Sequence, residues 1–223
     1  MRIFLDTASI DEVRRAARFG VVSGVTTNPT LLAREGNGVS YRQRILEIAE
    51  VIDGPISAEC VSRDPDRLVE EARELASWHP NVVVKIPIDE AGLEAIHRLA
   101  QEGIAVNTTL IFSPNQALLA ALAGAAYLSP FVGRLDDVGQ DGMELVRQCV
   151  AIVEAHGLGA KVLAASLRHP QHVIQAALAG AHIATIPPPV LYQMLRHPLT
   201  DQGIERFLED ARRAGIIGEP ART

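Results

Sequence analysis

One lysine stands inside a short apolar run, Val82-Val83-Val84-Lys85-Ile86-Pro87. Most of the run is β-branched and Pro87 ends it, which is typical of a buried strand. Burying an ammonium group is costly, so burial favours the neutral amine. A neutral amine in a dry pocket attacks a ketone and forms a Schiff base. Lys85 is therefore a candidate nucleophile for carbonyl chemistry; the alternative is a strand-end lysine that reaches the surface.

The choice of basic residues supports the first interpretation. The chain has 19 arginines and only two lysines, Lys85 and Lys161. Arginine stays protonated and is a poor nucleophile, so it cannot replace lysine in Schiff-base chemistry. A chain that otherwise uses arginine for positive charge has kept a lysine in this strand.

Polar residues also occur at the ends of the other apolar runs. Active sites of α/β barrels lie where the carboxyl ends of the strands meet. Residues two apart on a strand share a face, so Thr26 with Asn28, Asn107 with Thr109, and Ser129 with Phe131 can point inward together. Any one of these residues alone could be explained as a cap or turn residue. Polar residues at the ends of seven strands together indicate that they line one opening of the barrel. The polar strand-end residues are Asp6, Thr26, Asn28, Glu59, Lys85, Asn107, Thr109, Ser129 and Ser166.

Two arginines follow the later strands closely, Arg134 after the sixth and Arg168 after the seventh. The arginine fork binds phosphate through two parallel hydrogen bonds. Barrels often bind phosphate at the loops after strands seven and eight. We expect Arg134, Ser166 and Arg168 to form a phosphate site, although two surface arginines would be ordinary in so arginine-rich a chain.

The elements that must position these residues alternate along the chain. Alternating strands and helices predict parallel strands with helical crossovers, and eight units predict a closed (β/α)₈ barrel, the TIM barrel. A doubly wound open sheet is the competitor, but no glycine-rich fingerprint follows the first strand. The predicted strands are 3–6, 21–28, 56–59, 82–86, 104–110, 126–131, 161–166 and 182–186. The predicted helices are 9–19, 40–52, 64–77, 89–101, 113–124, 136–156, 169–180, 187–196 and 200–214.

Several helix starts carry capping signals. Ser9 followed by Glu12 predicts a capping box. Asp64 with Pro65, and Ser113 with Pro114, predict capped helix starts with proline in the first turn. Thr200 is the expected cap of the last helix.

Composition limits the possible functions. The chain has 223 residues with no linker-like stretch, 48% hydrophobic residues and a net charge of −6. This predicts one barrel domain over residues 1–223, and mixed acids and bases argue against nucleic-acid binding. Two cysteines, Cys60 and Cys149, predict neither a disulfide framework nor a metal site, and we interpret the seven histidines as structural or solvated. With no signal peptide or membrane span in the pattern, we expect a cytoplasmic protein.

Several motifs together identify a resemblance that covers nearly the whole chain in order. They are Phe4-Leu5-Asp6-Thr7, Gly24-Val25-Thr26-Thr27-Asn28-Pro29-Thr30, Val84-Lys85-Ile86-Pro87, Asn107-Thr108-Thr109-Leu110-Ile111-Phe112-Ser113, Ser129-Pro130-Phe131-Val132-Gly133-Arg134 and Ala165-Ser166-Leu167-Arg168. The chain resembles the transaldolases, specifically the small-subunit group that includes the fructose-6-phosphate aldolases. This resemblance implies a class I aldolase-like TIM barrel that acts on sugar phosphates without cofactor or metal.

The resemblance also implies roles for individual residues. Lys85 would form the Schiff base, and Asp6 would take the proton from the substrate hydroxyl as the carbon–carbon bond breaks. Glu59, with a water held by Thr109, would move protons as the imine forms and hydrolyses. The residues implied to contact substrate are Thr26, Asn28, Asn107, Ser129, Phe131, Arg134, Ser166 and Arg168.

Two activities fit this family. A transaldolase of the pentose phosphate pathway passes the three-carbon enamine from a ketose phosphate to an aldose phosphate, whereas an aldolase protonates it and releases dihydroxyacetone. In this family the aldolase type has Gln at the position of Glu59 and Tyr at the position of Phe131, so the chain follows the transaldolase pattern. A non-catalytic sugar-phosphate-binding barrel is the remaining alternative, although binding alone does not require Lys85, Asp6 and Glu59 together.

The resemblance further implies a homo-oligomer, a decamer of two pentameric rings, with the C-terminal helix at about 200–214 packing on a neighbour. The alternative is a helix that closes its own barrel.

Overall fold

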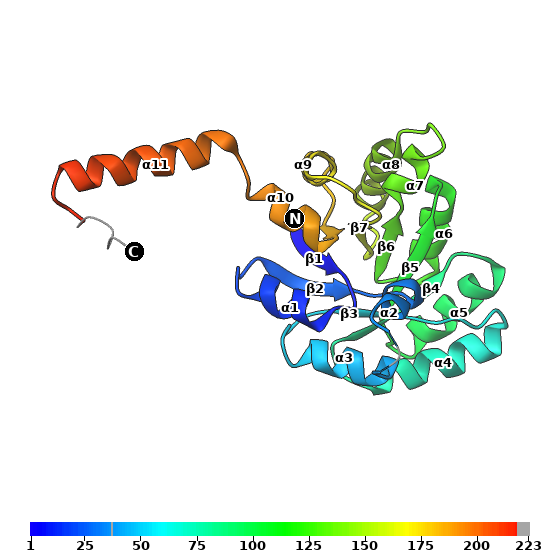
Figure 1. Cartoon of the computed structure of the whole chain (residues 1–223). Helices are drawn as coiled ribbons and strands as arrows, with labels where there is room; N and C mark the ends of the chain where they lie inside the picture. The colour runs from blue at the N-terminus through cyan, green and yellow to red at the C-terminus, as the bar shows by residue number, and fades with distance from the viewer. Residues whose placement is uncertain (37, 218–223) are drawn as a thin grey trace.

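Eight parallel strands close into a barrel in the computed structural model, which describes residues 1–36 and 38–217 (Figure 1). Each strand pairs with the next in the sequence, and β1 also pairs with β8, so the sheet has no free edge. The predicted (β/α)₈ barrel is thus confirmed and the open sheet is excluded. The strands are β1 (Arg2–Asp6), β2 (Val22–Thr26), β3 (Ile56–Glu59), β4 (Val82–Pro87), β5 (Val106–Ile111), β6 (Tyr127–Pro130), β7 (Lys161–Ala164) and β8 (Ile183–Ile186).

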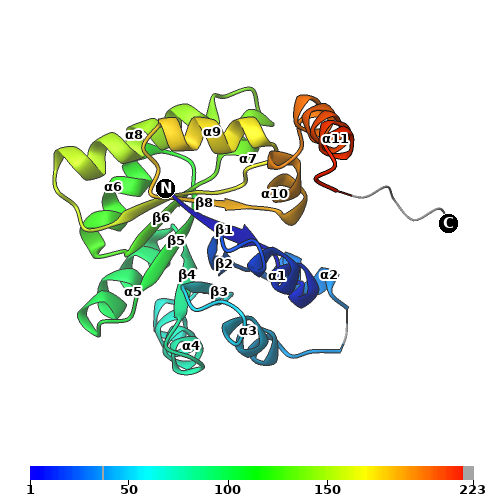
Figure 2. The ribbon, with the colours of Figure 1, turned by 90° about the vertical axis from the view of Figure 1, so that its left-hand side faces the viewer.

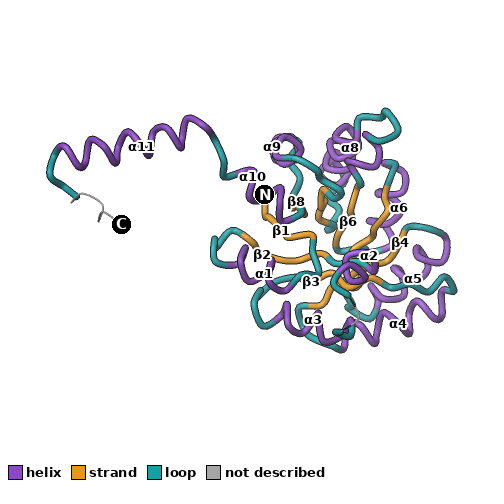
Figure 3. The backbone as a smooth tube through the Cα atoms, viewed as in Figure 1, coloured by secondary structure: helices purple, strands orange, loops and turns teal. Residues whose placement is uncertain are grey.

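Helices surround the barrel, and α11 extends away from it (Figures 1 and 2). The tube view shows the strands inside and helices outside (Figure 3). None of the helices within the described residues has the length and apolar character needed to cross a membrane. The helices are α1 (Ile10–Ala17), α2 (Pro29–Arg34), α3 (Tyr41–Ala49), α4 (Pro65–Ser77), α5 (Glu90–Gln101), α6 (Pro114–Ala123), α7 (Val132–Asp136), α8 (Gly142–Ala155), α9 (Pro170–Leu178), α10 (Pro188–Met194) and α11 (Pro198–Arg213).

Two predicted capping arrangements are wrong. Ser9 is the N-cap residue of α1, as predicted, but its side chain makes no capping bond; its backbone N–H donates to Thr7 Oγ1, so there is no capping box. Glu12, the expected other half of that box, accepts a hydrogen bond from Tyr192. The last helix begins at Pro198 rather than after Thr200, because proline is pre-organised for the first helical position.

Two helices differ from the sequence pattern. The predicted helix 136–156 is two helices, α7 and α8, because Asp141 caps a new start by accepting hydrogen bonds from Met143 N and Glu144 N. The short helix α2 was not predicted, and the strand before it ends at Thr26, two residues short of the expected end. The remaining predicted elements agree with the structure to within three residues at each end.

The barrel contains an apolar cluster as well as the polar residues of the strand ends. Phe4, Leu163 and Ile183 are buried in one cluster with Phe131 and Ala165. Gly24 makes room for this cluster, since a Cβ there would lie 2.6 Å from the Phe4 ring.

Candidate active site

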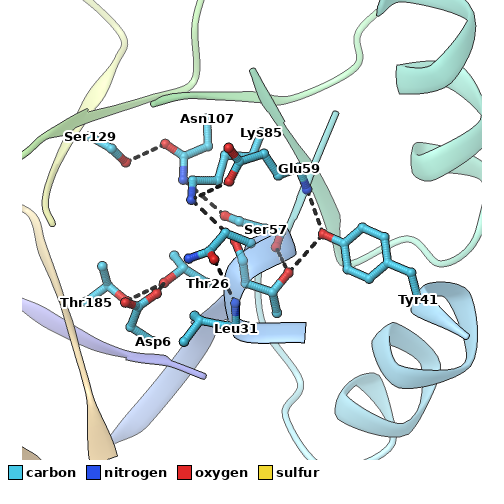
Figure 4. Close-up of polar contacts among 12 residues, drawn as sticks. Asp6, Thr26, Leu31, Tyr41, Ser57, Glu59, Lys85, Asn107, Ser129 and Thr185 are labelled. Atoms are coloured by element: carbon cyan, nitrogen blue, oxygen red, sulfur yellow. Dashed lines mark hydrogen bonds and ion pairs between the residues drawn. The ribbon is translucent and has the colours of Figure 1, made fainter. Parts of the chain in front are cut away.

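The register of three neighbouring strands brings the central residues to one level. Glu59 on β3 is paired with Lys85 on β4, and Lys85 is paired with Asn107 on β5. On the two strands that precede these in the barrel, Asp6 on β1 is paired with Thr26 on β2, and β2 in turn pairs with β3. The side chains of these residues point toward one another in the barrel interior (Figure 4).

Lys85 is buried, at 5% exposure, and is compensated by a carboxylate. Its Nζ lies 2.9 Å from Glu59 Oε2 and donates a 3.3 Å hydrogen bond to the carbonyl of Thr27. The buried lysine is therefore not a strand-end residue reaching the surface. Its amino group lines the same cavity as Glu59 and Asp6, where a substrate carbonyl can reach it.

Asp6 is held by a short chain of hydroxyl groups. Thr26 Oγ1 donates to Asp6 Oδ1 at 2.7 Å and lies 2.6 Å from Thr185 Oγ1. Because the Thr26 proton is used on Asp6, the Thr185 hydroxyl must donate to Thr26. Burial raises the pKa of Asp6 above its ordinary value, and this outweighs the lowering by Lys85, the Thr26 hydrogen bond and Arg34.

Asn107 supports the site from below. It is fully buried, its Nδ2 donates to Ser57 Oγ at 3.0 Å, and its Oδ1 accepts from Ser129 Oγ at 2.7 Å. Both ends of the amide are thus engaged, which fixes its orientation. Asn107 does not line the cavity, so here its amide orders Ser57 and Ser129.

Tyr41 links Glu59 to the end of β2. Glu59 N donates to Tyr41 Oη at 2.7 Å, and Tyr41 Oη lies 3.0 Å from Thr27 Oγ1, whose proton goes to the Ser57 carbonyl at 2.7 Å. The Tyr41 hydroxyl must therefore donate to Thr27. Burial raises the pKa of Tyr41 to about 12, so the phenol is neutral. This chain fixes the backbone around both Glu59 and the Thr27 carbonyl that holds Lys85.

The mouth of the barrel contains a cavity of about 330 Å³. Thr109 Oγ1 is buried and has no hydrogen-bond partner among the described residues, whereas the buried Glu59 Oε2 is paired with Lys85 Nζ at 2.9 Å. The Thr109 hydroxyl is therefore the group left to bind a water or a substrate. The predicted residues that line the cavity are Asp6, Thr26, Asn28, Glu59, Lys85, Thr109, Ser129, Phe131, Arg134 and Ser166. Lining residues that were not predicted are Pro29, Thr30, Leu110, Ala165 and Thr185.

Asn28 has a second function in the structure. It lies beyond the end of β2, not inside the strand with Thr26 as expected, and its Oδ1 accepts from Leu31 N at 2.9 Å as the cap of α2. Its Nδ2 remains available on the cavity side. The capping bond fixes the amide, since an oxygen that accepts from Leu31 leaves the nitrogen to face the other way.

Of the three residues predicted to bind phosphate, Arg134 and Ser166 line the cavity and Arg168 does not. Arg134 lines it, with its guanidinium 4.9 Å from the Phe131 ring centre. Ser166 also lines it, in a left-handed backbone conformation (φ 58°) that is strained for a residue with a side chain. Arg168 does not line the cavity; it is about half exposed and forms a two-pronged ion pair with Asp137.

The chemistry of the site is that of an amine and two carboxylates. Within residues 1–36 and 38–217, no group of three or more His, Cys, Asp or Glu side chains is placed to hold a metal ion. A buried amine, an acceptor oxygen beside it and a carboxylate across the cavity form a set suited to imine chemistry on a carbonyl substrate.

Comparison with known sequences supports this assignment. A sequence model of the transaldolase/fructose-6-phosphate aldolase family matches residues 3–220. A probable transaldolase of Heliobacterium modesticaldum is 61% identical over 210 residues, which cover 94% of this chain and 97% of that protein. A probable transaldolase of Roseiflexus castenholzii is 60% identical, with 94% and 96% coverage. The resemblance inferred from the motifs is thus confirmed.

A solved structure shares the fold only. A mandelate oxidase variant carrying an FMN adduct superposes with a TM-score of 0.56 at 20% identity, covering 83% of this chain and 63% of that one. This similarity supports the barrel architecture.

The raised pKa of Asp6 predicts a cost in stability at neutral pH. The folded state binds this proton more tightly than the unfolded state, so the stability that Asp6 contributes falls as the pH rises from its ordinary pKa of 3.8 through the raised value. Asp6→Asn keeps the acceptor for Thr26 but removes the charge. We expect the variant to melt at a higher temperature than the wild type at pH 7, by about 2–4 °C for each kcal/mol gained in the free energy of unfolding. The gain should be smaller near pH 4.

Calorimetry at both pH values would measure the effect, with the exposed loop residue Asp53 changed to Asn as the matched control. A D6N protein less stable than the wild type at pH 7 would show that attraction to Lys85 outweighs the burial cost.

Proposed function

The chain belongs to the transaldolase/fructose-6-phosphate aldolase family, and from this premise we propose that it is a transaldolase acting through a Schiff base on Lys85. It transfers a dihydroxyacetone unit from sedoheptulose 7-phosphate or fructose 6-phosphate to glyceraldehyde 3-phosphate or erythrose 4-phosphate, as in the pentose phosphate pathway. The observation that carries the proposal is the buried Lys85 amino group beside Glu59 and across the cavity from Asp6. No metal or cofactor takes part.

Imine formation begins when Lys85 Nζ attacks the C2 carbonyl of the ketose. Glu59, 2.9 Å from Nζ, accepts a proton from the amine and returns one to the departing hydroxyl, so that water leaves and an iminium forms. Thr109 and Glu59 line the same cavity, and a water held by Thr109 Oγ1, which has no partner among the described residues, relays these protons. The same groups work in reverse when the imine is hydrolysed.

Carbon–carbon cleavage uses Asp6 as the base. Asp6 takes the proton of the C4 hydroxyl, the C3–C4 bond breaks, and its electron pair moves toward the iminium nitrogen, which leaves an enamine on Lys85 and a free aldose phosphate. The raised pKa of Asp6 suits a group that must take up a proton and return it to the next substrate. The hydrogen bond from Thr26 fixes the carboxylate for this step.

The remaining polar residues orient the sugar. Asn28 and Ser129 line the cavity and contact hydroxyl groups, while Asn107 holds Ser129 in place. Arg134 and Ser166 bind the phosphate, and Arg168 lies beside them. This anchor fixes the sugar relative to Lys85, which makes the reaction effectively unimolecular.

The fate of the enamine depends on which proton donors it meets. Phe131 lines the cavity and packs edge-on against Phe112, with a centroid separation of 5.7 Å, so it presents a ring without a hydroxyl to the site. Without a phenol there, the enamine persists until an aldose phosphate arrives, which favours transaldolase. Fructose-6-phosphate aldolase activity, with release of dihydroxyacetone, is the second candidate, and the family assignment fits it equally.

The chain also has features of an oligomer. Helix α11 has no buried residue, and its apolar side chains Leu199, Ile204 and Phe207 are 69%, 52% and 73% exposed. Exposed apolar residues along one helix favour burial against another protein surface. We propose that the chain is a single barrel domain with a helical arm that packs on a neighbour in a homo-oligomer. Of the domain range 1–223, residues 37 and 218–223 lie outside the described part.

The setting proposed for the enzyme is the cytoplasm. Both cysteines, Cys60 and Cys149, are buried free thiols rather than partners in a disulfide, which is the ordinary state in a reducing compartment.

The proposed reaction predicts covalent trapping. Borohydride with fructose 6-phosphate should add the mass of a reduced imine to the wild type and add nothing to Lys85→Met, whose turnover should fall by at least about 10³-fold. The matched control is Lys161→Met, because Lys161 is the other lysine and is exposed. Wild-type protein that gains no mass would leave only the non-catalytic binding barrel.

Product assays separate the two activities. With fructose 6-phosphate and erythrose 4-phosphate, we expect sedoheptulose 7-phosphate and little free dihydroxyacetone. Phe131→Tyr adds a hydroxyl to the cavity wall and should raise the ratio of dihydroxyacetone to sedoheptulose 7-phosphate by about 10-fold, a modest effect for an introduced proton donor. Phe112→Tyr, which places its hydroxyl outside the residues lining the cavity, should leave the ratio unchanged. Abundant dihydroxyacetone from the wild type would identify an aldolase.

The helical arm predicts a change in assembly. Phe207→Glu puts a charge in the middle of the exposed apolar side of α11 and should shift the protein to a smaller species in light scattering, while the barrel stays folded by circular dichroism. Leu178→Glu, on the exposed surface of α9, is the matched control and should not change the mass. A wild type that is monomeric at micromolar concentration would contradict the proposed oligomer.

A further inference from the structure

A cluster of charged and titratable side chains lies beside the cavity and outside the imine chemistry. Asp136 and Asp137 stand at the end of α7, in the connection after β6. Arg168 and His172 belong to the connection after β7 and the first turn of α9. Two neighbouring loops at the mouth of the barrel are thus joined through this cluster.

Asp137 holds the side chain of Arg168. Its two carboxylate oxygens accept from Nη1 and Nη2 of Arg168, each at 2.5 Å. The Arg168 guanidinium keeps the pKa of Asp137 below its ordinary value, so the carboxylate is charged at neutral pH. This end-on pairing uses one N–H of each terminal nitrogen and leaves three other N–H groups for a further acceptor.

Asp136 holds the main chain of Arg168 through a histidine. His172 Nδ1 accepts from Arg168 N at 3.3 Å, so its proton is on Nε2, which lies 3.1 Å from Asp136 Oδ2. Asp136 Oδ1 also accepts from Gly142 N at 3.0 Å, which ties it to the start of α8. His172 is 9% exposed, so these bonds are sheltered from water.

Gly133 sets how close Arg168 lies to the cavity. A Cβ on Gly133 would be 2.6 Å from Arg168 Nε and 2.5 Å from the Ser166 carbonyl, so the arginine lies directly on this backbone. Gly133 N donates to that same carbonyl at 3.0 Å. Arg134, which follows Gly133, and Ser166, two residues before Arg168, both line the cavity, so Arg168 lies beside the cavity wall without lining it.

We propose that Asp137 and His172 are positioning residues that hold Arg168 at the phosphate end of the cavity before substrate arrives. Arginine has many rotamers, and ordering an exposed side chain on binding lowers affinity. A side chain held in advance by Asp137, on a backbone held by His172 and Asp136, avoids that loss. The inference rests on the proposed function, which assigns this end of the cavity to the phosphate.

The test compares a phosphorylated donor with the unphosphorylated unit. Borohydride trapping gives the half-saturating concentrations of fructose 6-phosphate and of dihydroxyacetone. We expect Asp137→Asn to raise the half-saturating concentration of fructose 6-phosphate by about 10-fold and to leave that of dihydroxyacetone unchanged. Turnover at saturating fructose 6-phosphate should stay within about twofold of the wild-type value. The control, Glu102→Gln, neutralises another two-pronged pair, with bonds of 2.8 and 2.6 Å from Arg73 on α4 to Glu102 just after α5, and should change neither value.

Substitutions of His172 provide an independent test of the proposal. His172→Ala should raise the half-saturating concentration of fructose 6-phosphate, and His172→Asn, whose carbonyl keeps an acceptor for Arg168 N, should restore part of it. An equal change for both substrates would indicate a general structural role and overturn the proposal. A lower value in D137N would overturn it too, because Asp137 would then compete with phosphate.

Inorganic phosphate separates this inference from the proposed reaction. Inorganic phosphate can stabilise the protein in a thermal-shift titration without a Schiff base. The titration therefore measures anion binding even if borohydride traps no substrate on the wild type. We expect phosphate to stabilise the wild type and E102Q alike, and D137N only at about 10-fold higher concentration. Equal stabilisation of D137N and the wild type would overturn the proposal.

Discussion

The buried amino group of Lys85 is the constraint on which the rest of the mouth depends. A lysine in a barrel strand is tolerated only if a carboxylate meets it, and the β3–β4 register provides Glu59 at the same level. The Thr27 carbonyl also accepts a hydrogen bond from Lys85, and Tyr41 accepts one from Glu59 N, which holds the backbone beside the ion pair. One costly group is thus stabilised by contacts from two neighbouring strand ends, those of β2 and β3.

The barrel interior combines an apolar cluster with polar networks. The cluster that contains Phe4, Leu163 and Ile183 needs no hydrogen-bond partners. The polar groups are joined in chains, such as Ser129 to Asn107 to Ser57. Satisfied networks of this kind are rigid because each member has a defined donor or acceptor role. Thr109 Oγ1, at the cavity, is left without a hydrogen-bond partner among the described residues.

Much of the fold and site could be predicted because strand ends converge by topology. An apolar run with a polar residue at its end is enough to place Asp6 or Glu59 at the mouth, whatever the packing. Contacts made by residues that are not at the ends of strands could not be predicted in this way. Tyr41 reads as an ordinary helix residue, and Asn28 as the end of a strand, until the three-dimensional structure shows their hydrogen bonds. Thr185 could have been identified from the sequence, because it is the polar residue in the otherwise apolar run of β8.

The same distinction explains why the phosphate end could be predicted only in part. Lys85 and Asp6 lie on strands whose geometry the barrel fixes, whereas Arg134, Ser166 and Arg168 lie on connections after β6 and β7. A loop residue has no sheet register to hold it, so its position must come from specific contacts. The strained backbone of Ser166 and the pairing of Arg168 with Asp137 are such contacts. Precision at this end of the cavity is therefore built from side chains, while at the other end it comes from the sheet.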